Sequence, residues 1–207
     1  MLQFVNYSKS YNQHLVLQVP ELILPHDLYW LKGGNGSGKT TLIKSISGLI
    51  PFDGSIQVDR TAINKERVLY RLKVNYAEAE PLYPDFLTGN DLVQFYKKTK
   101  KASDAQILQL TEALGVGSYI GNKVGTYSSG MTKKLSLVLG LMGQPKLILL
   151  DEPLITLDQQ TVAALQHILE DYYRDGITLL ITSHQEITFA GKFSCRLAVR
   201  DKTIALV

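Results

Sequence analysis

The chain has 207 residues, of which 45% are hydrophobic and 20% are charged, a size and composition that predict one globular domain of residues 1–207. Its 22 basic and 19 acidic residues form no long basic run, so composition does not favour a nucleic-acid-binding protein. No run of 18 apolar residues and no signal-like leader occurs, so we expect a chain that is soluble and reaches a membrane only through a partner.

The N-terminal part alternates apolar and polar residues as half-buried β-strands do. This alternation recurs in segments separated by Asn, Pro, Asp and Gly, at residues 2–7, 14–19 and 55–58. We expect them to form a small antiparallel β layer. A further apolar strand at 28–31 enters a glycine-rich loop, and apolar residues at helical spacing follow from Leu42 to Leu49.

The remaining sequence predicts a helical lobe followed by a parallel sheet. Residues from about 85 to 140 have mostly helical periodicity, and we interpret them as a lobe inserted in the core. Continuous apolar strands at 147–150 and 177–182 flank a helix expected from roughly Gln160 to Tyr173. This pattern is typical of a buried parallel sheet with crossover helices, so the predicted class is α/β with a mostly parallel sheet.

A phosphate-binding motif occupies the glycine-rich loop. Gly33, Gly38, Lys39 and Thr40 fit the pattern G-x-x-x-x-G-K-[ST], between a strand and a helix as the motif requires. The backbone N–H groups and the helix N-terminus would face a phosphate, Lys39 would bridge the outer phosphates, and Thr40 would offer a hydroxyl to Mg²⁺. The alternative is an ordinary glycine turn. The motif indicates a P-loop NTPase core, which kinases, GTPases, motors and transport ATPases share.

Two later strands end in polar residues at the sheet edge where ligands bind in α/β proteins. "LILLDEP" ends in Asp151 and Glu152, of which one carboxylate can hold Mg²⁺ and the other can deprotonate an attacking water. "ITLLITSH" ends at Ser183 and His184. A lone histidine is more often a structural residue, but beside a P-loop and an acidic pair we interpret His184 as part of the site.

The segment "TYSSGMTKKL" distinguishes among the P-loop families. Two serines and a glycine that open a helix are on their own an ordinary N-cap. Here they precede the acidic strand, and nearly the whole chain resembles the ATP-binding cassette (ABC) ATPases. In that family the segment is usually L-S-G-G-Q and contacts the outer phosphate of ATP held by the other subunit. The matching residues are Ser128, Ser129 and Gly130, with departures at Tyr127, Ser129 and Met131.

The resemblance implies a role for each residue that matches a family motif. Tyr11 matches the aromatic residue that stacks on adenine, although an exposed strand tyrosine is the alternative. Asp158 matches the loop through which the two subunits sense each other, and His184 matches the switch histidine at the outer phosphate. Asp151 and Glu152 match the Walker B motif, with Glu152 as the base. The Walker A residues expected to bind ATP are Gly33, Gly34, Asn35, Gly36, Ser37, Gly38, Lys39, Thr40 and Thr41.

A departure from the family lies in "VNYAEAEPLYPDFLTGNDL", where the family usually has a glutamine that touches Mg²⁺ and the attacking water. Alignment on "LYP" puts Glu78 at that position, and alignment on "LTG" puts Ala79 there, with Glu80 one step further. We favour Glu78 as a metal ligand beside Thr40 and Asp151. The alternative is that Glu78 and Glu80 only solvate a loop.

The function implied by the resemblance is that of the ATP-hydrolysing subunit of a membrane transporter. Its cofactors would be ATP and Mg²⁺, and its active form a closed homodimer or a pair with a paralogous cassette, docked on transmembrane permease subunits. The localisation would be cytoplasmic and peripheral to the membrane, which agrees with a single cysteine, Cys195, and a reducing compartment. The alternatives are a soluble ABC-type ATP switch that is not involved in transport and an inactive regulatory cassette.

Overall fold

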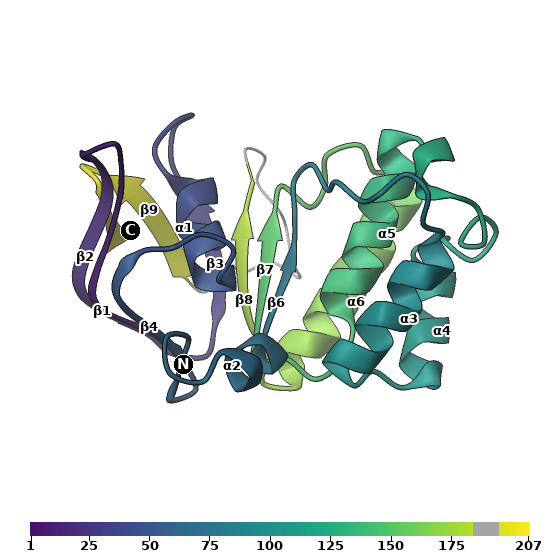
Figure 1. Cartoon of the computed structure of the whole chain (residues 1–207), viewed down its shortest axis with the longest axis horizontal. Helices are drawn as coiled ribbons and strands as arrows, with labels where there is room; N and C mark the ends of the chain where they lie inside the picture. Colours follow the sequence, from purple (N-terminus) through teal and green to yellow (C-terminus); the bar gives the residue numbers. More distant parts are fainter. Residues whose placement is uncertain (184–194) are drawn as a thin grey trace.

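In the computed structural model, which describes residues 1–183 and 195–207, the chain forms two β-sheets and a group of helices on the far side of the larger sheet (Figure 1). The smaller sheet is antiparallel, in the order β2-β1-β4-β5. It contains β1 (Leu2–Tyr11), β2 (His14–Leu24), β4 (Asp53–Val58) and β5 (Thr61–Ala62). The antiparallel β layer predicted from the alternation is therefore confirmed.

The larger sheet has the strand order β10-β9-β3-β8-β7-β6, and only the β9–β10 pair is antiparallel. The predicted mostly parallel sheet is confirmed. Two of its central strands, β7 (Leu147–Asp151) and β8 (Thr178–Thr182), are buried at every residue, which explains their continuous apolar sequence. The others are β3 (Leu28–Lys32), β6 (Val74–Ala77), β9 (Cys195–Arg200) and β10 (Thr203–Leu206).

Helix α1 (Lys39–Ser47) packs between the two sheets. Its buried residues Leu42, Ile43 and Ile46 join apolar side chains of both sheets in one core. Gly48 ends the helix with φ of 77°, a conformation that glycine adopts without strain. A short helix, α2 (Arg67–Lys73), then leads into β6.

A second core lies on the opposite face of the larger sheet, where the helices α3, α4, α5 and α6 pack. Three of these helices, α3 (Gly89–Lys100), α4 (Asp104–Ala113) and α5 (Ser129–Leu141), lie between β6 and β7 in the sequence, where the helical lobe was predicted. A single 3-10 turn, Val124–Thr126, precedes α5. Helix α6 (Gln159–Arg174) connects β7 to β8.

The strand order places the carboxyl ends of β3, β8, β7 and β6 side by side. In the registers of these strands, Thr182 pairs with Leu31 on one side and with Asp151 on the other. The loop after β3, the acidic residues at the end of β7 and the segment after β6 therefore meet at one sheet edge, as α/β sheets arrange their ligand sites.

Among the described residues, no helix is both long and apolar enough to cross a membrane.

Candidate active site

The glycine-rich loop turns sharply between β3 and α1. Gly36 and Gly38 have φ of 74° and 106°, values that favour glycine. A Cβ atom at Gly38 would lie 3.1 Å from Leu17 Cγ, so the space beside the backbone also favours glycine. No side chain caps the start of α1, so its first N–H groups remain available to a ligand in the loop.

The loop and the acidic strand end enclose a cavity of about 490 Å³. This cavity brings together most of the residues predicted for nucleotide binding from the two motifs. It is lined by Val16, Gly34, Asn35, Gly36, Ser37, Gly38, Lys39, Thr40, Thr41, Ala79, Asp151 and Glu152. We call it the nucleotide cavity below.

Lys39 lies at the base of the nucleotide cavity with only 9% of its surface exposed. Its ammonium donates hydrogen bonds to the carbonyl oxygens of Gly33 at 2.7 Å and Gly34 at 3.2 Å. Lys39 therefore stabilises the loop by hydrogen bonding to the loop backbone at Gly33 and Gly34. A compact ammonium in this place is suited to binding phosphate oxygens as a point charge.

The two acidic residues at the end of β7 are anchored to the neighbouring strand, Asp151 through its carboxylate and Glu152 through its backbone N–H. Asp151 is 3% exposed, and its Oδ1 accepts a hydrogen bond of 2.6 Å from the Thr182 hydroxyl. The Glu152 N–H donates to the Thr182 side-chain oxygen at 3.0 Å and to the Thr182 carbonyl at 3.2 Å. Glu152 has φ of 46°, a conformation that persists in a residue other than glycine where its surroundings fix it.

The oxygen donors of the nucleotide cavity fit Mg²⁺. The Thr40 hydroxyl and the Asp151 carboxylate line the same cavity, and both are ligand types that Mg²⁺ prefers. No group of three or more His, Cys, Asp or Glu side chains in the described part of the chain is arranged as a metal cage. Mg²⁺ usually completes its shell with substrate phosphates and waters rather than with protein ligands alone, so this donor set is sufficient.

The segment after β6 lies between two cavities. Ala79 lines the nucleotide cavity, whereas Glu78 lines a second cavity. This placement agrees with the alignment that puts Ala79 at the glutamine position. The role of Glu78 as a metal ligand stays a prediction.

A buried lysine, Lys133 on α5, lies behind the carboxylates. Its ammonium donates to the carbonyl oxygens of Glu78 at 2.7 Å, Ala79 at 3.1 Å and Asp151 at 3.0 Å. Burial lowers the pKa of Lys133 to about 8, and the nearby carboxylates of Asp151, Glu152 and Glu78 oppose that shift. Three carbonyl acceptors match the three N–H donors of an ammonium.

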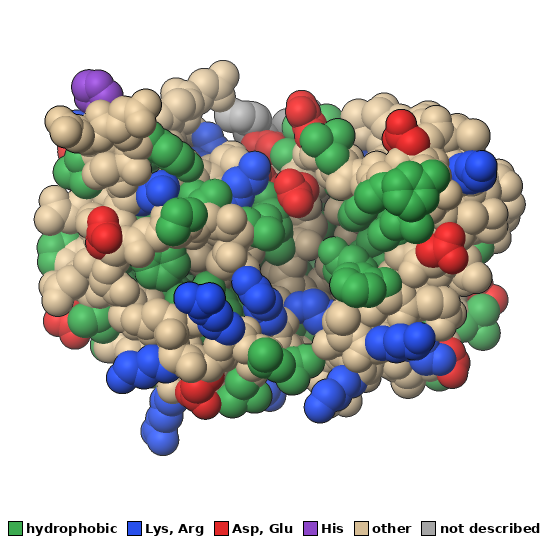
Figure 2. Space-filling model, in the orientation of Figure 1, with side chains coloured by type: hydrophobic (Ala, Val, Ile, Leu, Met, Phe, Trp, Pro, Cys, Tyr) green, Lys and Arg blue, Asp and Glu red, His purple; other side chains and the backbone are tan. Residues whose placement is uncertain are grey.

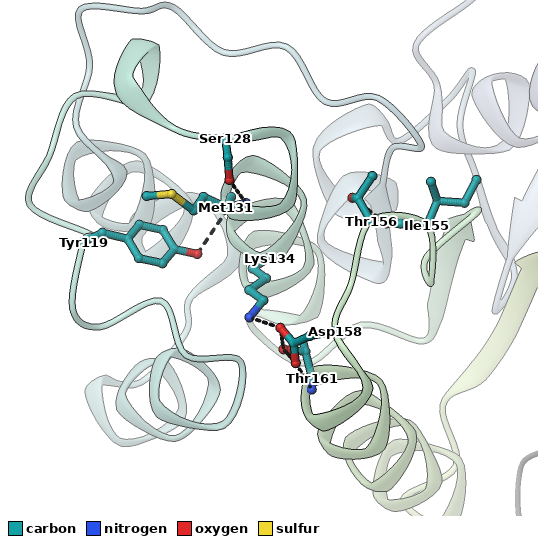
Figure 3. Close-up of polar contacts among 8 residues, drawn as sticks. All are labelled: Tyr119, Ser128, Met131, Lys134, Ile155, Thr156, Asp158 and Thr161. Atoms are coloured by element: carbon teal, nitrogen blue, oxygen red, sulfur yellow. Dashed lines mark hydrogen bonds and ion pairs between the residues drawn. The ribbon is translucent and has the colours of Figure 1, made fainter.

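The predicted signature residues lie at the start of α5, where Figure 3 shows Ser128 beside Met131. Ser128 caps the helix, because its hydroxyl accepts the Met131 N–H at 3.2 Å. Ser128 and Ser129 are exposed, and they do not line the nucleotide cavity of their own chain. A Cβ atom at Gly130 would lie 3.1 Å from the Thr156 carbonyl oxygen, so this glycine allows the segment before α6 to approach α5.

Asp158 joins the segment before α6 to α5 (Figure 3). It caps α6 by accepting the Thr161 N–H at 2.8 Å, and its other carboxylate oxygen pairs with the Lys134 ammonium at 2.6 Å. The hydrogen bond from Lys134, helped by the Thr161 donors, lowers the pKa of Asp158 below its usual range. These contacts within one chain place the predicted dimer loop beside the signature helix.

Tyr11, the predicted adenine-stacking residue, does not line the nucleotide cavity. Tyr11 ends β1, is 48% exposed, and has the Lys9 ammonium 4.5 Å from its ring centroid. Its role in adenine stacking stays a prediction. His184 lies outside the described residues, so its predicted contact with the outer phosphate also stays a prediction.

The sequence interpretation missed Thr182 and Lys133. Thr182 is the last residue of β8, and its contact with the acidic pair depends on its register opposite Asp151, which the sequence does not show. Lys133 lies one helical turn before Leu137 on the buried side of α5, so a charged residue on an apolar helix face was the available signal.

Comparisons with known proteins agree with this geometry. A family model described as ABC transporter matches residues 22–155. The uncharacterized ABC transporter ATP-binding protein YybJ of Bacillus subtilis (strain 168) is 31% identical and aligns over 90% of this chain and 86% of its own length.

Two solved structures share the fold. The structure of an ATP-binding subunit of an ABC transporter has a TM-score of 0.90 at 22% identity, and the match covers 100% of this chain and 89% of that one. A dimeric ATP-binding cassette in a post-hydrolysis state, bound to ADP and Pi, has a TM-score of 0.81 at 20% identity. That match covers 99% of this chain and 96% of the other.

Proposed function

The chain belongs to the ABC transporter family and is an ATP-binding, ATP-hydrolysing cassette, and we propose that it acts as a dimer docked on transmembrane permease subunits. The observation that supports ATP hydrolysis is the nucleotide cavity, where the phosphate loop meets the buried Asp151 and the partly buried Glu152. Docked in this way, the chain would lie peripherally on the cytoplasmic face of the membrane.

The residues of the nucleotide cavity suit in-line attack of water on the outer phosphate of ATP. Glu152, at the end of β7, would accept the proton of the attacking water. Lys39 and the loop N–H groups would stabilise the negative charge of the transferred group. Thr40 and Asp151 would hold Mg²⁺, which would further neutralise phosphate charge when bound.

The site of one chain lacks the signature contact. Ser128, Ser129 and Gly130 are at the start of α5 and do not line the nucleotide cavity of the same chain. We propose that they face the outer phosphate of ATP held by a second cassette, either identical or paralogous. ATP would then join the two chains, and hydrolysis would release them.

Replacement of Lys39 by Ala is expected to weaken nucleotide binding by about 10- to 100-fold, because a charge-assisted contact to phosphate is lost. An equilibrium titration with a fluorescent ATP analogue measures the change. Lys44→Ala is the matched control, since Lys44 lies in the last turn of α1, away from the loop. Equal affinities for wild type, Lys39→Ala and Lys44→Ala would contradict the phosphate role.

The second cavity is the proposed docking groove for a membrane subunit. It measures about 670 Å³ and opens between α2, α3 and the segment after β6. Several of its apolar side chains are exposed, including Leu49 at 57%, Val68 at 78% and Phe95 at 62%. Figure 2 shows hydrophobic and basic side chains gathered over the part of the surface where α2 and α3 lie.

The composition of the docking groove defines the segment that fits it. Exposed apolar side chains favour an apolar partner surface, and Arg71 at the groove favours acidic residues beside it. A short cytoplasmic segment of a permease subunit that combines the two would bury this surface. Binding of a permease segment here would distinguish transport from a soluble ATP switch, which has no membrane subunit.

A Phe95→Asp substitution is expected to reduce association with the permease by about tenfold or more, because it places a charge where an aromatic ring would be buried. Co-purification of membrane protein after extraction in a mild detergent measures the association. Leu108→Asp on α4 is the control, because Leu108 is similarly exposed, at 58%, but does not line the groove. Equal recovery of membrane protein with both variants would argue against docking at the groove.

A further inference from the structure

Lys133 joins three parts of the chain at one point. It is 2% exposed, and its ammonium donates one hydrogen bond to each of three backbone carbonyl groups. Two carbonyls belong to Glu78 and Ala79 after β6, and the third belongs to Asp151 at the end of β7. An ammonium has three N–H donors, so all of them are used here.

We propose that Lys133 is a positioning residue for ATP hydrolysis: it fixes the main chain that carries Glu152 and the wall between the nucleotide cavity and the docking groove. The proposal rests on the proposed function, because the reaction that Lys133 serves is the one assigned to Glu152. Lys133 itself contacts backbone oxygens rather than reacting atoms.

The peptide group between Asp151 and Glu152 is held at both ends. Its carbonyl accepts from Lys133 at 3.0 Å, and its N–H donates to the two oxygens of Thr182. Because a peptide group is planar, these contacts together fix its orientation. Glu152 has φ of 46°, which is costly for a residue other than glycine, so its conformation depends on such anchors.

The carbonyls after β6 belong to the wall between the two cavities. Glu78 lines the docking groove, Ala79 lines the nucleotide cavity, and Lys133 binds the carbonyl oxygen of each. A partner in the groove that displaced this wall would therefore change the hydrogen bonds of Lys133, including the one to the Asp151 carbonyl. The same ammonium links the wall to α5, the helix that begins at the signature residues.

Replacement of Lys133 by Met is expected to lower kcat for ATP hydrolysis by about 10- to 100-fold, since small displacements of a catalytic group cost rates of this order. The affinity for ATP is expected to change by no more than about twofold, because Lys39 and the loop are untouched. Steady-state kinetics and nucleotide titration of the full chain measure the two quantities, and thermal unfolding reports the folded fraction.

Lys100→Met is the matched control for the chain measured without a permease, because Lys100 lines the docking groove and not the nucleotide cavity. The Lys100 ammonium also donates to backbone carbonyls, those of Arg71 and of Val74 at the opposite end of β6, and burial also lowers its pKa to about 8. A purely structural role predicts equal kcat values for the two variants after correction for folded protein, and that result would overturn the proposal. A positioning role predicts a loss of kcat only in Lys133→Met.

Two further measurements keep the proposal testable if Lys133→Met does not fold or if the wild type lacks activity. Lys133→Gln has two N–H donors for three carbonyl acceptors, so at least one anchor is lost and a kcat between those of the wild type and Lys133→Met is expected. A folded Gln variant with wild-type kcat would contradict positioning. Hydrogen exchange of the Glu152 amide needs no turnover and is expected to quicken in Lys133→Met or, less strongly, in Lys133→Gln, but not in Lys100→Met. Unchanged exchange would overturn the role of Lys133, whereas a wild type without ATPase activity would count against the proposed function alone.

Discussion

Replacement of Glu152 by Gln is expected to lower the rate of ATP hydrolysis by about 100- to 10,000-fold while ATP still binds. The amide has nearly the same shape as the carboxylate but cannot accept a proton from water at neutral pH. The backbone contacts of Glu152 to Thr182 involve its N–H group, so the substitution leaves them in place. Phosphate release with Mg²⁺ and excess ATP measures the rate, and a nucleotide titration measures binding.

The control for Glu152→Gln is Glu80→Gln. Glu80 is exposed, belongs to the segment after β6, and does not line the nucleotide cavity. The Glu80→Gln substitution removes the same charge as Glu152→Gln without removing the proposed base. The rate of ATP hydrolysis by Glu80→Gln is therefore expected to stay within about twofold of the wild type. A Glu152→Gln chain that hydrolyses ATP at the wild-type rate would show that another group accepts the proton.

The phosphate loop was predictable because its chemistry is local. The glycines, Lys39 and Thr40 are consecutive or nearly so, and their strand and helix flanks are clear in the sequence. The acidic pair was predictable for a similar reason, since an apolar strand that ends in Asp151 and Glu152 needs a polar environment at that end. Both motifs line the same cavity, as the topology of a parallel sheet requires.

The segment after β6 was harder to interpret because its side-chain directions depend on a short strand. β6 has four residues and carries a buried Asn75 whose side chain donates to the Met142 carbonyl, so it lacks the apolar pattern of β7 and β8. The choice between Glu78 and Ala79 is a shift of one residue, and the two residues line different cavities. The sequence alone does not show which residue faces which cavity.

The role of Lys133 could not be read from residue types. Its acceptors are backbone carbonyls that lie 55, 54 and 18 positions away in the sequence, and every residue has such a group. Only the packing of α5 against the carboxyl ends of β6 and β7 selects which carbonyls it meets. Contacts to backbone carbonyls therefore produce no motif in the sequence.

Replacement of Ser128 by Arg is expected to abolish the concentration-dependent ATPase activity, with a loss of about 100-fold or more. The substitution puts a long cationic side chain on the exposed N-terminus of α5, where the phosphate of a partner's ATP is proposed to bind. The helix N-terminus also loses its capping oxygen and gains an unfavourable charge. Steady-state rates measured over a range of protein concentrations, with Mg²⁺, test the prediction.

The control for Ser128→Arg is Ser103→Arg. Ser103 caps α4 as Ser128 caps α5, accepting the Gln106 N–H at the same distance of 3.2 Å, and it is also exposed. Both variants lose a cap worth about 1 kcal/mol, but only Ser128 belongs to the proposed interface. Specific activity is therefore expected to rise with concentration in the wild type and in Ser103→Arg, and to be absent in Ser128→Arg.

A mixture of two inactive variants tests directly whether two chains share one site. A hybrid of Lys39→Ala and Ser128→Arg contains one site in which an intact phosphate loop faces an intact signature segment. Random pairing at equal amounts makes about half of the dimers hybrids, each with one of two sites intact, so about a quarter of wild-type activity is expected. If instead Ser128→Arg alone hydrolysed ATP at the wild-type rate at every concentration, the nucleotide cavity would work within one chain and the dimer mechanism would be wrong.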